Sequence, residues 1–216
     1  MMDCVTYAME YKQNDTPQSP CSNGINKQTR ASLFALSRLH NNALLTPQEM
    51  DAHDFFSAVF NGEIGTVQNC VESKGVPVNG MPPKCLLDYQ INAAPALMLA
   101  LRQGHVVIAD YLLKHGADAK ILSEQDGTTV HALIRGCLVK VENNGLTTEN
   151  LLPYLKVLKK LIKGGADPNL RVPAYPSPLE ILSLEVVPHL NNLDIKFAYE
   201  EVCDFLTCFL RKYGAK

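Results

Sequence analysis

One short pattern recurs four times along the chain and limits the folds that it can adopt. In each copy, an apolar segment with helical periodicity is followed by a closing glycine and then by small or polar residues. A glycine just beyond a helix supplies a left-handed conformation, and Asp or Asn suits the turn that comes next. The copies lie at 74–79 (KGVPVN), 115–120 (HGADAK), 164–169 (GGADPN) and 213–216 (YGAK). This order predicts a stack of helical repeats.

The beginnings of the repeats can be recognised as well. Thr46-Pro47-Gln48-Glu49 is a capping box with proline at the first helical position, and Ser177-Pro178-Leu179-Glu180 opens the last repeat. Residues 95–105 (PALMLALRQGH) and 126–131 (DGTTVH) open the two repeats between them. The apolar helices before the closing glycines are expected at Val67–Val71, Val106–Leu113, Leu155–Ile162 and Val202–Leu210.

With these openings and closings, residues 46–216 resemble the ankyrin repeat family, whose repeats open with T-P-L-H, continue after G-H and close with G-A-D-x-N. The resemblance implies an all-α ankyrin-repeat solenoid of helix–turn–helix pairs, at about 46–79, 94–120, 126–169 and 177–216. Residues 1–45 are expected to form a polar tail and a short N-terminal capping helix. The segment 11–30 has almost no aliphatic side chains, whereas Ala31–His40 carries leucines three residues apart.

The repeats are longer than the family period of about 33 residues. Successive closing glycines are 41, 49 and 49 residues apart. The extra residues are expected near Gly80–Ala94, Cys137–Leu152 and Leu184–Ala198. The last two segments could be loops between paired helices, or the helices themselves could be longer.

Composition excludes several classes of protein. A net charge of −2 argues against a nucleic-acid partner, and no stretch of about 18 apolar residues supports integral membrane association. Seven scattered cysteines, with no C-x-x-C pair, and a start without secretory character indicate a reducing, cytoplasmic location. The same N-terminus would also tolerate delivery into a host cell.

Catalytic and metal-binding motifs are absent from the sequence. We therefore predict no catalytic residue, no metal and no cofactor. His131 stands at the histidine of the family's opening motif, so the resemblance implies hydrogen bonds to neighbouring backbone and hydroxyl groups. Asp118, Asp167, Asn79 and Asn169 belong to the closing turns and are expected to cap local backbone N–H groups.

The resemblance also places candidate partner-binding residues on finger loops and concave helices. Tyr and Arg, which are enriched at binding hot spots, occur among them. The finger residues are Asp88, Tyr89, Gln90, Glu124, Gln125, Asp126, Arg171 and Tyr175, and the concave-helix residues are Arg102, Gln103 and Arg135.

Four lysines form a separate pattern. Lys156, Lys159, Lys160 and Lys163 recur at helical spacing and so share one helix face. This face could simply be solvated, or it could be a basic docking stripe for an acidic partner or for anionic lipid headgroups.

A repeat stack without catalytic motifs predicts a non-enzymatic module or adaptor that binds another protein. Ankyrin modules with irregular insertions also occur among bacterial effectors that act on host proteins, which is a narrower form of the same hypothesis. The alternatives are a recognition module of a larger enzyme and an enzyme with its site in the repeat insertions.

Overall fold

The protein was analysed as a computed structural model that describes residues 46–83, 94–123, 126–143, 146–172, 175–184 and 193–216. The chain divides into two units, Met1–Thr46 and Pro47–Lys216, and residues 1–45 of the first lie outside the described part. The fold below is that of the second unit. The expected tail and capping helix, as well as most of the first expected insertion, lie outside the described residues.

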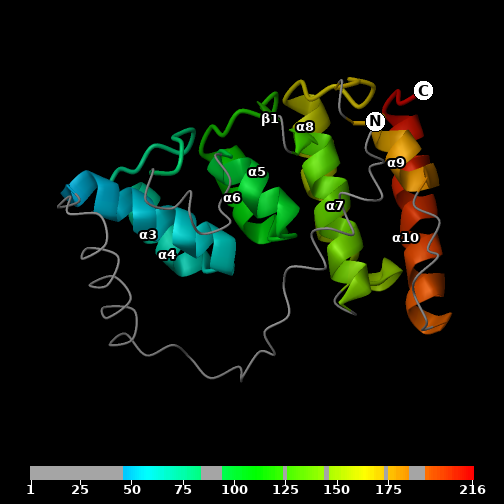
Figure 1. Cartoon of the computed structure of the whole chain (residues 1–216), viewed down its shortest axis with the longest axis horizontal. Coiled ribbons are helices and arrows are strands. Elements are labelled where there is room, and N and C mark those ends of the chain that lie inside the picture. Colours follow the sequence, from blue (N-terminus) through cyan, green and yellow to red (C-terminus); the bar gives the residue numbers. More distant parts are fainter. Residues whose placement is uncertain (1–45, 84–93, 124–125, 144–145, 173–174, 185–192) are drawn as a thin grey trace. The chain divides into compact units, whose positions relative to one another are not determined.

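Eight α-helices are described, and they form four consecutive pairs (Figure 1). The predicted pairing is therefore present. The pairs are α3 (Pro47–Asn61) with α4 (Ile64–Glu72), α5 (Ala96–Arg102) with α6 (Val106–Lys114), α7 (Thr129–Glu142) with α8 (Leu152–Lys163), and α9 (Pro178–Leu184) with α10 (Leu193–Lys212). Two short strands, β1 (Leu122–Ser123) and β2 (Gly127–Thr128), pair antiparallel before α7, and a 3₁₀ turn, η2 (Thr148–Asn150), precedes α8.

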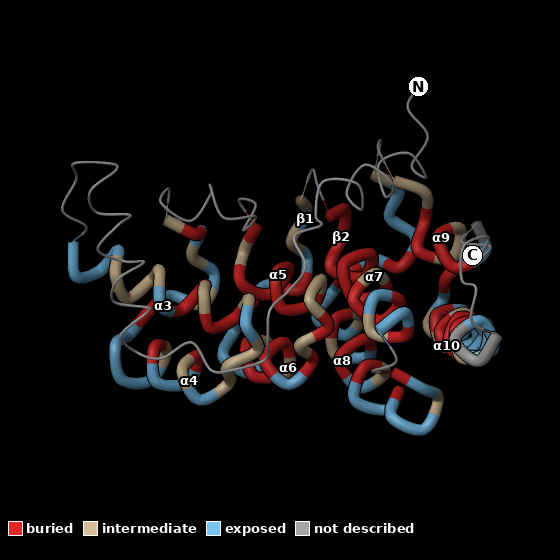
Figure 2. Tube along the Cα trace, turned by 60° about the horizontal axis from the view of Figure 1, so that its bottom comes forward, coloured by how far each residue is buried: buried red, intermediate tan, exposed pale blue. Residues whose placement is uncertain are grey.

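The helices stack in two rows (Figure 2). The first helices α3, α5, α7 and α9 contact one another in order, and α4, α6 and α8 do the same in the second row. The last helix departs from this order, because α10 packs on α7 as well as on its partner α9. We call the surface of the first row, with its connecting loops, the first-helix face, and the surface of α4, α6 and α8 the second-helix face.

The core runs between the rows and is most complete around α5. Residues Ala96–Leu101 of this helix are all fully buried. A helix that is apolar on every side must be enclosed on every side, and α5 contacts α3, α6 and α7. The second repeat is therefore the centre of the packed structure.

The closing glycines end the helices as the sequence predicts. Gly75, Gly116, Gly165 and Gly214 have φ values of +68°, +86°, +95° and +94°. Side chains with a Cβ rarely adopt these values. Each glycine therefore reverses the chain at the end of a second helix.

Hydrogen bonds also fix the openings of the third and fourth repeats. The Thr128 hydroxyl and the His131 side chain form a reciprocal capping box at the start of α7. At α9, the Ser177 backbone N–H donates to the Glu180 carboxylate (2.6 Å), and the Glu180 N–H donates to the Ser177 hydroxyl (3.3 Å). The N–H bond from Ser177 lowers the pKa of Glu180.

The second expected insertion is partly a longer helix, because α7 continues to Glu142, and partly a connection that includes η2. Cys137 is not in a loop: it is fully buried within α7. In the last repeat, α10 begins at Leu193 and is 20 residues long, while residues 185–192 lie outside the described part. The helices proposed from the apolar segments are also each longer than expected at one or both ends, because the amphipathic pattern continues through polar residues.

The closing turns correct one expectation. Asp118 and Asp167 do cap locally, accepting from the backbone N–H groups of Lys120 and Asn169, both at 2.8 Å. The two asparagines instead reach the next repeat. Asn79 donates to the Gly116 carbonyl and accepts from the Asp118 N–H, both at 2.9 Å. Asn169 bonds in the same way to the Gly214 carbonyl (2.9 Å) and the Lys216 N–H (2.7 Å).

Candidate functional site

Several of the candidate partner-binding residues meet on the first-helix face. Arg102 ends α5, Asp126 precedes β2, and Arg135 lies on α7. The Arg102 guanidinium lies 3.3 Å from the Asp126 carboxylate, and that of Arg135 lies 3.7 Å from it. Asp126 is only 2% exposed, so it is an internal counter-ion for two arginines and not an exposed finger-tip residue.

Tyr175 extends this cluster toward solvent. The Arg135 guanidinium lies over the Tyr175 ring, 4.8 Å from its centroid, which is within the range of a cation–π contact. Both side chains are half-buried. The Tyr175 ring also lies 6.1 Å from the ring of His131. The cluster therefore presents a flat Arg–Tyr pair on top of buried polar groups.

His131 has the structural role that the resemblance implied. Its Nε2 donates to the Pro176 carbonyl (2.9 Å), and its Nδ1 accepts from the Thr128 backbone N–H (3.1 Å). Burial lowers the pKa of His131. The neutral imidazole thus holds the loop before α9, and Tyr175 with it, against the start of α7.

The remaining candidates lie apart from this cluster. Gln103 is half-buried beyond the end of α5. Arg171 is exposed and pairs with Glu180 at 2.6 Å. Asp88, Tyr89, Gln90, Glu124 and Gln125 lie outside the described residues.

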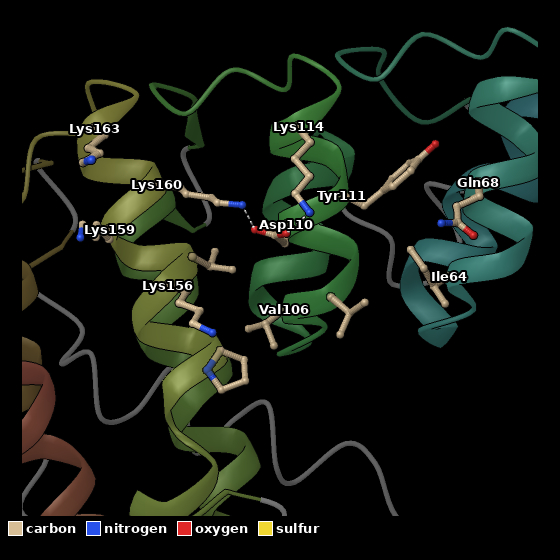
Figure 3. A pocket seen from close by; sticks show the side chains of 13 residues that line it. Ile64, Gln68, Val106, Asp110, Tyr111, Lys114, Lys156, Lys159, Lys160 and Lys163 are labelled. Carbon is tan, nitrogen blue, oxygen red and sulfur yellow. Dashed lines mark hydrogen bonds and ion pairs between the residues drawn. The ribbon is translucent and has the colours of Figure 1, made fainter.

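The second-helix face holds a groove of about 570 Å³ between α4, α6 and α8 (Figure 3). All four lysines of the predicted stripe line it, together with Lys114 of α6. Apolar side chains share the lining: Ile64, Val106, Val107, Pro153 and Val157. We call this site the lysine groove.

Asp110 is the one carboxylate in the lining of the lysine groove. It pairs with Lys160 across the gap between α6 and α8, and with Lys114 (2.9 Å) on its own helix. Partial burial raises the pKa of Asp110, but hydrogen bonds from Lys160 and Lys114 outweigh this effect and lower it overall. Sequence reasoning missed Asp110. Its spacing from Lys114 was visible, but its pairing with Lys160 depends on how the repeats stack.

The described residues offer little for catalysis or metal binding. They contain no group of three His, Cys, Asp or Glu side chains that could hold a metal ion. The buried thiol of Cys137 has a raised pKa, mainly because of desolvation, so it remains protonated and unreactive. Within the same residues, no helix is both long and apolar enough to cross a membrane.

Comparison with known proteins identifies the repeat. Residues 94–124 match the family model of the ankyrin repeat. The structure is similar to the crystal structure of an ankyrin repeat domain from Acinetobacter baumannii AYE, with a TM-score of 0.51 and 17% sequence identity. The match covers 98% of this chain and 93% of that one. No curated protein matches the sequence. The predicted all-α repeat stack is therefore confirmed.

Proposed function

We propose that this chain, a member of the ankyrin repeat family, is a non-enzymatic module that binds another protein through its first-helix face. The observation that carries the proposal is the Arg135–Tyr175 pair. Repeat stacks present extended surfaces on a rigid scaffold, and such surfaces typically bind proteins.

The pair has the properties of a binding hot spot. Arg and Tyr are among the residue types enriched at such positions. Asp126 holds the Arg135 guanidinium from below, and His131 fixes the loop that carries Tyr175. Because these contacts already hold both side chains, Arg135 and Tyr175 lose little conformational entropy when a partner covers them.

Narrower roles share this binding step. An adaptor in a reducing compartment, an effector acting on host proteins and the recognition module of a larger enzyme would all use the same surface. The identity of the captured partner distinguishes them.

The experiment is affinity capture with chemical cross-linking from the source cells, followed by reconstitution of the binary complex with the purified partner. Tyr175→Ala and Arg135→Ala should each weaken binding by about 1–2 kcal/mol. Arg211→Ala, which removes an exposed arginine from α10, is the matched control and should bind normally. If Tyr175→Ala and Arg135→Ala both bind the partner normally, with unchanged melting temperatures, the interface lies outside the first-helix face.

A further inference from the structure

We propose that the lysine groove is a second binding site, which takes an acidic segment of a partner protein with apolar residues among its carboxylates. The site lies on α4, α6 and α8 and shares no residue with the Arg135–Tyr175 cluster. It therefore does not depend on the function proposed for the first-helix face.

The positive charge of the lysine groove indicates that its ligand is negatively charged. Five lysines and one aspartate line it, although the whole chain has a net charge of −2. Like charges at helical spacing destabilise a helix, so a cluster of this kind favours an anionic ligand that relieves the repulsion. Lys156, Lys159 and Lys163 are exposed, and their ammonium groups can reach such a ligand.

The apolar part of the lining indicates that the ligand carries apolar side chains as well as negative charge. Val107 is 65% exposed, although it lies in the middle of the repeat stack. Ile64 of α4 and Pro153 of α8 line the same groove. A ligand that carried only charge would leave these side chains in water, whereas leucines between carboxylates would cover them.

The groove's shape favours a peptide over a lipid surface. It holds about 570 Å³ and is open to solvent, so it can take part of an extended chain. Asp110 and Lys160 lie across the gap between α6 and α8, and Lys114 projects toward the same point (Figure 3). A flat bilayer would touch the rim of this hollow, but a peptide chain can enter it.

Asp110 competes with the ligand. Its carboxylate occupies Lys160 and Lys114 in the free protein, so part of the positive charge is already neutralised. Replacing it with asparagine leaves the shape nearly unchanged and releases both lysines. A site for carboxylates should then bind more tightly, whereas a merely structural ion pair would give no such gain.

The test uses a fluorescein-labelled peptide of repeated Glu-Glu-Leu and measures its fluorescence anisotropy with the full chain. The triple variant Lys156→Gln/Lys159→Gln/Lys163→Gln should bind about tenfold more weakly, as expected for the loss of three exposed ion pairs. Asp110→Asn should bind about threefold more tightly. Raising the salt from about 0.1 M to about 1 M, which shortens the screening length from about 10 Å to about 3 Å, should weaken binding to the wild type.

Two controls separate the site from general charge attraction. Lys196→Gln/Arg211→Gln/Lys212→Gln removes the same charge from exposed positions of α10 and should bind the peptide like the wild type. A Gln-Gln-Leu peptide should not bind. Tyr175→Ala should also bind the acidic peptide normally, which keeps this test independent of the first-helix face.

Three results would overturn the proposal. The first is no peptide binding by the wild type, and the second is equal weakening by the groove and α10 triple variants. The third is binding to vesicles of phosphatidylcholine with phosphatidylserine, but not to the peptide, with loss in the groove variant. That last result would assign the groove to a membrane surface.

Discussion

The joins between consecutive repeats are built in two different ways. At the first and third joins, an asparagine in one closing turn bonds to the backbone of the next closing turn, through Asn79 and Asn169. At the second join, Lys120 stands at the corresponding position, and its side chain lies against Gly165. The second join is held mainly between α5 and α7, and the Thr129 hydroxyl at the start of α7 donates to the Ala119 carbonyl of the second closing turn at 2.7 Å.

A glycine in α7 makes that helix contact possible. A Cβ at Gly136 would overlap the carbonyl oxygen of Leu101 and lie about 3 Å from the Gly104 backbone. The Tyr154 hydroxyl, from α8, donates to the Gly104 carbonyl at 3.1 Å. The comparison shows that stacked repeats can be joined by side-chain amides at their turns or by close backbone approach at their helices.

The largest expected effect comes from adding a side chain where α7 lies close to the end of α5. Gly136→Ala places a Cβ against backbone that cannot move aside, so the free energy of unfolding should fall by about 3 kcal/mol. Urea denaturation measures this loss. Gly65→Ala is the matched control, because nothing lies within 4 Å of its Cβ on α4. It should be neutral or stabilising by about 0.5 kcal/mol, and equal losses in the two variants would contradict the close approach.

Removing an asparagine bridge should have a smaller effect. Asn79→Ala or Asn169→Ala removes two hydrogen bonds to the next closing turn, so each should lower the free energy of unfolding by about 1–2 kcal/mol. Lys120→Ala, at the same position of the second join, should change it by less than about 0.5 kcal/mol. Urea denaturation of the three variants side by side would show whether the joins differ. Three equal values would mean that they do not.

Mild acid should weaken the first and third joins. His105 donates to the Phe60 carbonyl (3.0 Å) at the first join, and His131 donates to the Pro176 carbonyl at the third. Burial lowers the pKa of both imidazoles. The unfolded chain therefore binds more protons below about pH 6.5, and stability present above that pH is lost as the pH falls.

At the second join, burial raises the pKa of Tyr154 to about 12, so this group does not titrate near neutrality. Between pH 7 and pH 5, the free energy of unfolding should fall by about 1 kcal/mol. The double variant His105→Asn/His131→Asn should show a flatter pH dependence, whatever its absolute stability. A slope equal to that of the wild type would assign the effect to other groups.

The smallest expected effect is a gain. Lys120→Asn gives the second closing turn the residue that bridges the other two joins, and it should raise the free energy of unfolding by about 0.5 kcal/mol. Thermal and urea denaturation would both detect a gain of this kind. A loss would show that the contact of the Lys120 side chain with Gly165 contributes more than an amide bridge would.

The sequence predicts features that local signals encode. The positive φ of Gly116 and the hydrogen bonds of His131 to its neighbours could be predicted, because both depend on residues close in sequence, although the capping box that His131 forms with Thr128 was not foreseen. Four lysines of the groove could be placed on one face by helical spacing alone.

Contacts between repeats could not be predicted in this way. In the sequence alone, Gly136 looks like a residue that weakens its helix, and only the structure shows that it lets α7 approach the backbone at the end of α5. Lys160 pairs with Asp110, which lies 50 positions away in the sequence. Asp126 looked like an exposed loop residue because nothing near it in sequence shows that Arg102 and Arg135 enclose it. These contacts depend on the stacking of repeats that differ in length.

The missing amide bridge at the second join should give the stack a preferred hinge. We expect the second join to be stiffer where Gly136 meets the Gly104 backbone than along the closing-turn edge, where Lys120 replaces an asparagine. Rocking of one half of the stack against the other should therefore pivot at the glycines and open or close the turn edge. The Asp110–Lys160 pair spans the same join, so this motion would also change the width of the lysine groove and couple the binding of a ligand there to the angle between the two halves.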